Sequence, residues 1–211
     1  MTLKGHEPRK YSSPGGEQHE SKYVSCISYF PDGKQMISGS GDKTIRRWDL
    51  RKGKEIVEDR GDEKYVQAVR VSRDGRWVAV AGGNGIKVSE VETGIVRTFH
   101  DSWIYCIDIS ADSTLLAGAS FDGVRIWNLD TGELVAGPFD IGSYIPAALR
   151  FSEDSRKLAV SSYVSEERHL EVWDVQTQKL DVQKSTRGTS GNHEFTFCPL
   201  MYNFLHKAVG K

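Results

Sequence analysis

Cysteine is scarce in this sequence, and long apolar runs and an excess of either charge are missing. Three cysteines occur in 211 residues, which argues against a disulfide framework. No apolar run approaches the roughly 20 residues of a membrane helix, and the first residues lack the apolar core of a secretory signal. The formal net charge is −1, which gives no general attraction to nucleic acid or to an anionic membrane. We therefore expect an intracellular protein, cytoplasmic or nuclear.

Motifs of catalysis and of cofactor binding are also missing. The nucleophile motif Gly-x-Ser-x-Gly does not occur, and the six histidines and three cysteines form no His-x3-His or Cys-x-x-Cys pair. The segment from Gly39 to Thr44 superficially resembles a phosphate-binding loop. It lacks the Gly-x4-Gly-Lys-Thr spacing, however, and it joins two expected strands instead of opening a helix. We expect no catalytic residue, no metal site and no cofactor.

What the chain does contain is a repeated unit. An aspartate follows an apolar strand and precedes a second strand four times, at spacings of 42, 38 and 42 residues: Asp32, Asp74, Asp112 and Asp154. A polar turn and a third strand come next, and these third strands end at Trp48, Ser89, Trp127 and Trp173. A polar or acidic residue and a fourth, weaker strand then complete the unit. Self-similarity of this length decides the architecture of a chain.

Four strands in about 40–45 residues, ending in Trp-Asp, are the signature of a WD40 propeller blade. Over residues 20–183 the chain therefore resembles the WD40-repeat family, which implies an all-β, partial β-propeller of four antiparallel blades. We expect blades at 22–62, 63–100, 101–140 and 141–183. Residues 1–21 are expected to be an outer-strand or loop segment, partly disordered, and 184–211 an irregular tail or an aborted fifth blade.

The resemblance also implies a structural hydrogen-bonding network inside each blade. Its expected members are Ser38, Asp42 and Trp48 in the first blade, His100, Asp122 and Trp127 in the third, and Trp173 in the fourth. Of the six histidines, only His100 stands at the family's histidine position by spacing, and Glu20 stands there in the first blade. The Gly5-His6 pair looks like the turn that opens such repeats, but some fifteen extra residues then precede the next strand.

Two further features depart from the pattern of the family. Arg47 stands where the other blades have Val88, Ile126 and Val172, so this core-facing arginine must pair or extend to water. The connection from Ser161 to His169 is longer than its counterparts, and we expect a surface hairpin loop there that can contact a partner.

Four blades do not make a complete ring, because a WD40 ring usually has about seven. The first and fourth blades would expose apolar faces. Three outcomes stay open: a piece of a longer propeller, a homodimer that closes an eight-blade ring, or an open arc that a partner covers.

The function that the resemblance implies is a non-catalytic protein-interaction scaffold with protein partners. Nine residues before each turn aspartate stand Tyr23, Tyr65, Trp103 and Ile145, the last with Tyr144 beside it. In the WD40 family this place lies near the top of the ring, where partners bind. Aromatic residues there would be anchors, since binding hot spots favour Tyr and Trp. The alternative is that they only pack over the blade tops.

Two other functions follow from parts of the resemblance. Trp48-Asp49-Leu50-Arg51 is similar to the box by which WD40 substrate receptors dock on the adaptor of cullin-type ubiquitin ligases, with Arg51 as the docking residue. The simpler reading is a solvated arginine in an ordinary turn. The chain also resembles the sensor array of a longer signalling ATPase. We expect no nucleic-acid partner, because the basic residues near the first blade have no interleaved aromatics.

Overall fold

The computed structural model describes residues 3, 5–6, 9–12, 18–21, 23–59, 65–99 and 102–187, and in these residues all regular structure is β-strand. Four four-stranded antiparallel sheets and one two-stranded sheet are present. The first sheet contains β3 (Val24–Tyr29), β4 (Gln35–Ser40), β5 (Ile45–Asp49) and β6 (Lys54–Asp59). The second contains β7 (Val66–Val71), β8 (Trp77–Gly82), β9 (Gly85–Glu90) and β10 (Val96–Phe99). The expected all-β class is therefore confirmed.

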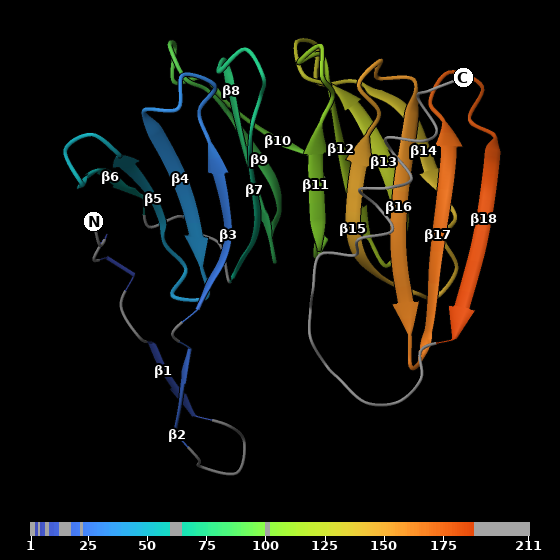
Figure 1. The fold of residues 1–211 in the computed structure, drawn as a ribbon, viewed down its shortest axis with the longest axis horizontal. Helices are drawn as coiled ribbons and strands as arrows, with labels where there is room; N and C mark the ends of the chain where they lie inside the picture. Colours follow the sequence, from blue (N-terminus) through green and yellow to red (C-terminus); the bar gives the residue numbers. More distant parts are fainter. Residues whose placement is uncertain are drawn as a thin grey trace.

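The third and fourth sheets repeat the same up-and-down order. The third contains β11 (Cys106–Ile109), β12 (Leu115–Ser120), β13 (Gly123–Asn128) and β14 (Leu134–Phe139). The fourth contains β15 (Ile145–Phe151), β16 (Lys157–Val164), β17 (Glu167–Asp174) and β18 (Leu180–Arg187). Along the chain, the first strands contact one another in succession, β3 with β7, β7 with β11, and β11 with β15. The four sheets thus stand in a row, with the first and fourth at its two ends (Figure 1).

The turn after each first strand is built from its own side chains. In the last three sheets a serine hydroxyl donates a hydrogen bond to the aspartate two residues later, as Ser152 does to Asp154. The Ser152 hydroxyl and the Arg156 N–H hold the pKa of Asp154 below its ordinary value. The chain then turns back through Gly75, Ser113 or Ser155, each with a positive φ. These local contacts explain why the turn recurs wherever Asp appears at this spacing.

The core lies between the sheets, because each of the two inner sheets buries both faces against its neighbours. Between the second and third sheets, fully buried residues include Trp77, Ile86, Ile107 and Leu116. Between the third and fourth they include Ile126, Leu149 and Leu158. On the other face of the fourth sheet only Ala159 and Val172 are buried, with Leu170 and Val182 partly exposed beside them. The two ends of the row are therefore the least covered parts of the core.

Three local details go beyond what the sequence led us to expect. Within the expected outer-strand or loop segment at 1–21, β1 (Arg9–Ser12) and β2 (Gln18–Ser21) form a hairpin that extends away from the four sheets (Figure 1). The expected surface hairpin loop at 161–169 is a hairpin made mostly of strand, because β16 and β17 pair continuously from Lys157↔Asp174 to Val164↔Glu167. β18 also continues to Arg187, beyond the expected end of the blade at 183. The tail from 188 to 211 lies outside the described residues.

Arg47 faces the side of the first sheet that packs on the second, as its position in the repeat implies. Its Nε donates to the Gln35 Oε1 atom at 2.6 Å, and its guanidinium lies over the Phe30 ring, 4.3 Å from the centroid. Burial lowers the pKa of Arg47. The Gln35 amide and the Phe30 ring thus stabilise the Arg47 guanidinium, where the other sheets have an aliphatic side chain in the core.

Candidate protein-interaction surface

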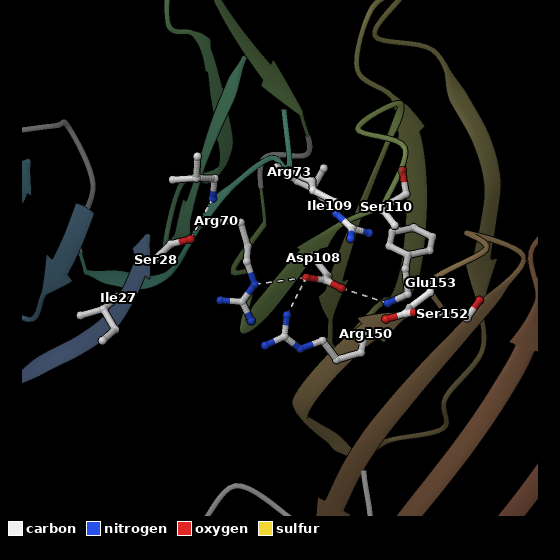
Figure 2. A pocket seen from close by; sticks show the side chains of 13 residues that line it. Ile27, Ser28, Arg70, Arg73, Asp108, Ile109, Ser110, Arg150, Ser152 and Glu153 are labelled. Atoms are coloured by element: carbon white, nitrogen blue, oxygen red, sulfur yellow. Dashed lines mark hydrogen bonds and ion pairs between the residues drawn. The ribbon is translucent and has the colours of Figure 1, made fainter. Parts of the chain in front are cut away.

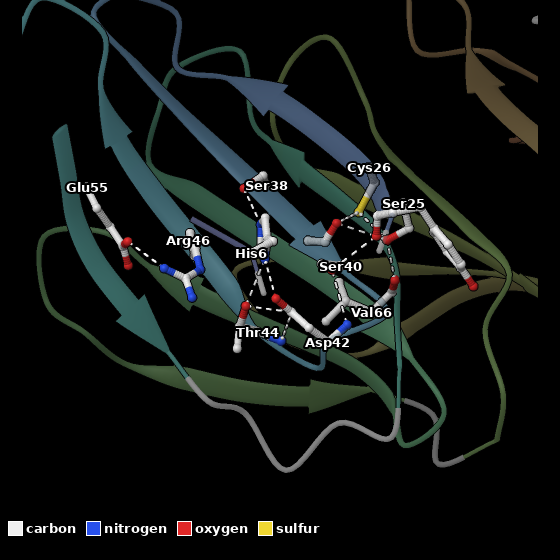
Figure 3. A network of polar contacts seen from close by, with 12 residues as sticks. His6, Ser25, Cys26, Ser38, Ser40, Asp42, Thr44, Arg46, Glu55 and Val66 are labelled. Carbon is white, nitrogen blue, oxygen red and sulfur yellow. Dashed lines mark hydrogen bonds and ion pairs between the residues drawn. The ribbon is translucent and has the colours of Figure 1, made fainter. Parts of the chain in front are cut away.

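A polar network crosses the first sheet and joins it to the N-terminal segment (Figure 3). The Nε2 atom of His6 lies 2.7 Å from the Ser38 hydroxyl, and its Nδ1 atom lies 3.0 Å from the Asp42 carboxylate. The Trp48 indole donates to the same Ser38 hydroxyl at 2.8 Å, and Thr44 donates to Asp42. Ser38, Asp42 and Trp48 therefore belong to one network, which fixes the turn between β4 and β5.

Spacing did not identify the histidine of this network, although the Gly5-His6 pair resembles the turn that opens such repeats. Spacing pointed to Glu20 in the first blade, but Glu20 pairs with Lys10 in the β1–β2 hairpin, and His6 takes the place. The inserted hairpin separates His6 from β3 in the chain, which hid the correspondence. Gly5 is required beside it, because a Cβ atom there would overlap the Trp48 indole. His100 lies outside the described residues.

Serine, histidine and aspartate in one chain of hydrogen bonds also resemble a hydrolase triad, which the sequence reasoning missed. Ser38 is buried, however, and its hydroxyl already receives the indole N–H of Trp48. A substrate carbonyl cannot approach such a hydroxyl without displacing the tryptophan. The network is chemically suited to holding β4 and β5 together, because it satisfies buried polar groups.

The other expected network residues lie in different surroundings. Asp122 receives a hydrogen bond from the Ser102 hydroxyl at 3.4 Å. Trp127 packs against Phe99, with ring centroids 5.8 Å apart. Trp173 stacks on Phe139 at 4.9 Å and donates its indole N–H to Glu171 at 3.2 Å.

Aromatic side chains gather at the end of the sheets where the first strands begin, which we call the top surface. Tyr65, before β7, lies 6.0 Å from Trp103, before β11, measured between ring centroids. Trp103 lies 6.4 Å from Tyr105, and Tyr105 meets Phe121 edge to face at 5.0 Å. These four residues, Tyr65, Trp103, Tyr105 and Phe121, form a continuous series that we call the top aromatic row.

The row combines buried area with exposed edges. Phe121 lies in the turn between β12 and β13 and is 53% exposed, whereas the other three rings are partly buried. Lys43 places its ammonium 5.9 Å from the Tyr65 centroid, at the end of the row. Among the described residues the buried Trp103 Nε1–H has no hydrogen-bond acceptor. Partly buried aromatics with a polar end are typical of interface anchors.

The structure places the four sequence-predicted contact residues in three ways. Tyr65 and Trp103 contact each other in the row. Tyr144 stacks on His169 of its own sheet, with centroids 4.0 Å apart. Tyr23 is 61% exposed. Tyr105 and Phe121 were missed, although the signal was present: both are aromatics in the segments that border the first strand and the second turn of the third repeat.

The expected docking box lies at the opposite end of the first sheet. Trp48 is buried, and the Asp49 carboxylate accepts the backbone N–H groups of Arg51 and Lys52. These hydrogen bonds, led by the one from Lys52, lower the pKa of Asp49. Asn128 and Asp174 cap the same turn in the third and fourth sheets. This part of the box is therefore ordinary turn chemistry, and Arg51 is an exposed side chain beside it.

Two absences apply to the described residues only. No group of three or more His, Cys, Asp or Glu side chains there could hold a metal ion. None of the described segments forms a helix that could cross a membrane.

The comparisons with known proteins agree with the four-sheet architecture. The family described as WD domain, G-beta repeat matches residues 13–49 and 94–128. A guanine nucleotide-binding protein subunit beta from Solanum tuberosum is 30% identical over 123 residues, which cover 52% of this chain and 32% of that protein. The small ribosomal subunit protein RACK1y of Oryza sativa subsp. japonica is 29% identical over 119 residues, 51% of this chain and 35% of that protein.

A longer match covers most of the chain. Transcription initiation factor TFIID subunit 5 of Caenorhabditis elegans is 27% identical over 194 residues, 89% of this chain and 28% of that protein. The chain thus spans about a third of the length of these relatives. Among solved structures, Kuenenia stuttgartiensis hydrazine synthase is similar with a TM-score of 0.68 at 18% identity, over 80% of this chain and 50% of that one. That likeness concerns the fold alone.

Proposed function

Because the chain belongs to the WD40-repeat family, we propose that it is a non-catalytic scaffold that binds protein partners through the top aromatic row. The relatives' names support a role in assemblies, since each is called a subunit or a subunit protein. The observation that carries the proposal is the continuous contact of Tyr65, Trp103, Tyr105 and Phe121 across two sheets, ending in an exposed phenylalanine.

The physical reason is the geometry of a good anchor. Rings that already touch one another lose little conformational freedom on binding, and they offer a large apolar area. The sheets beneath are packed on both faces, so they hold the row in place while a partner binds. A protein partner with an apolar surface would cover the exposed ring of Phe121 and the accessible edges of the other three rings.

Affinity capture with the 211-residue chain tests this proposal. Phe121→Ala removes an exposed ring, so we expect an unchanged melting temperature and a several-fold loss of captured partners. Ile95→Ala is the matched control, because Ile95 is similarly exposed at the other end of the second sheet. If both variants capture the same proteins in the same amounts as the parent chain, the row is not the binding site. Loss of folding in Phe121→Ala would show that the ring only packs over the sheets.

A further inference from the structure

The opposite end of the sheets from the top aromatic row contains a hollow of about 350 Å³, where the first strands end (Figure 2). Side chains from all four sheets line it, and five of them are charged: Arg70, Arg73, Asp108, Arg150 and Glu153. Three of these five residues are one repeat apart in the sequence. Arg70, Asp108 and Arg150 occupy the same place in β7, β11 and β15, where β3 has Ser28.

Asp108 stands at the centre of this group and joins three sheets. One carboxylate oxygen accepts a hydrogen bond from Arg70 Nε at 3.2 Å and from Arg150 at 3.1 Å, and the other accepts the backbone N–H of Phe151 at 2.9 Å. Arg70 also donates to the Val69 carbonyl. A guanidinium has five N–H donors, so each of the two arginines keeps donors that Asp108 does not use. Two guanidiniums therefore share one carboxylate.

The third arginine adds a charge that the hollow does not balance. Arg73 follows β7, is exposed, and points into the hollow (Figure 2). No ion pair links Arg73 to any residue of the described ranges, and Glu153 at the rim is the second carboxylate of the lining. Three guanidiniums against two carboxylates give the hollow one net positive charge. Arginine's planar donors fit a carboxylate with two parallel hydrogen bonds.

We propose that this hollow binds a carboxylate side chain from an acidic segment of a partner protein. The arginines converge on one basin and do not follow a stripe, so the site fits a single anionic side chain better than a nucleic-acid backbone. Its volume suits one or two side chains, and Arg70, Arg73 and Arg150 all line it. This site is separate from the top aromatic row and does not depend on it.

Binding of a labelled peptide with four consecutive glutamates, followed by fluorescence anisotropy, tests the proposal. The matched peptide has four glutamines. We expect the glutamate peptide to bind at least tenfold more tightly at low salt, and its affinity to fall as salt rises. Arg73→Gln should weaken the glutamate peptide about fivefold, and Glu153→Gln should strengthen it about twofold, because one removes an attractive charge and the other a repulsive one.

Arg168→Gln is the control, since Arg168 is exposed in β17 near the other end of the fourth sheet. It should leave the affinity unchanged. All three substitutions are at exposed positions, so melting temperatures should stay within about 2 °C of the parent. Equal binding of the two peptides, or equal effects of Arg73→Gln and Arg168→Gln, would overturn the site. A peptide with phosphoserine in place of the glutamates separates the anions: binding of that peptide alone would overturn the carboxylate assignment.

Discussion

The first and third sheets have the same four strands but different surroundings. The third sheet lies between two neighbours, and Ile107 in β11 is fully buried, with 0% exposed. Ile27 has the matching place in β3 and is 49% exposed, since no sheet in the described part of the chain covers that face. There the polar network of His6, Ser38 and Trp48 replaces a neighbouring sheet over part of the face. Position in the row, more than the sequence of a repeat, thus decides how its residues are stabilised.

The largest expected effect comes from this matched pair of isoleucines. Ile107→Ala should lower the free energy of unfolding by about 3 kcal/mol, because it leaves a cavity between two sheets. Ile27→Ala should lower it by less than about 1 kcal/mol. Denaturant titration with light scattering of the same samples measures both stability and mass. An equally large loss in Ile27→Ala would mean that this face is covered in solution, and the mass would show whether a second copy covers it.

The polar network should contribute somewhat less than the buried isoleucine. His6→Ala removes partners of both Ser38 and Asp42, so we expect a loss of about 2 kcal/mol in the free energy of unfolding. Glu20→Ala is the control, because the spacing of the repeat points to Glu20 while the hydrogen bonds point to His6. Thermal unfolding of both variants compares them directly. A larger loss for Glu20→Ala would restore the reading from spacing.

A smaller effect concerns the turn aspartates of the first and third sheets, Asp32 and Asp112, which should contribute differently to the pH dependence of stability. Burial acts to raise the pKa of Asp112, but hydrogen bonds from Ser110 and Thr114 outweigh it and hold the pKa below the ordinary 3.8. A lowered pKa in the folded state stabilises the protein above the ordinary value, and that stability is lost as pH falls through the folded pKa. The first sheet has Phe30 in place of the serine, so Asp32 lacks this donor.

We therefore expect Asp112→Asn to lower the free energy of unfolding by about 1 kcal/mol at pH 7. The effect is small because Asp112 is exposed. Asp112→Asn should also flatten the loss of stability below about pH 4. Asp32→Asn should change both quantities less. Urea titrations at several pH values between 2 and 7 measure them. If stability depends on pH in the same way in the two variants, the hydrogen bond from the Ser110 hydroxyl to Asp112 does not stabilise the turn.

The fold was predictable because its signals are local. Turn aspartates, short apolar strands and Trp-Asp endings each lie within a few residues, and they located all four sheets. His6 was not predictable from spacing, since an inserted hairpin stands between it and β3. The hollow was not predictable from one repeat, because residues from all four repeats line it. Reading one repeat position down the chain would have shown Ser28, Arg70, Asp108 and Arg150 together, but their contact depends on the packing of the first strands.

The smallest expected effect concerns Arg47, the position where the first sheet departs from all the others. Arg47→Ile restores the aliphatic residue that the third sheet has at Ile126, while it removes the Gln35 hydrogen bond and the contact with Phe30. Replacing a partly buried charge by a well-packed apolar residue is often neutral or stabilising. We expect a change of less than about 1 kcal/mol in the free energy of unfolding, of stabilising sign, measured by denaturant titration. Gln35→Leu together with Arg47→Ile removes the amide left without its partner, and it should add to the gain. A loss above about 2 kcal/mol in the free energy of unfolding of the double variant would instead show that the first sheet requires the arginine. The first sheet would then differ from the third in the residues that its core needs, as well as in its place in the row.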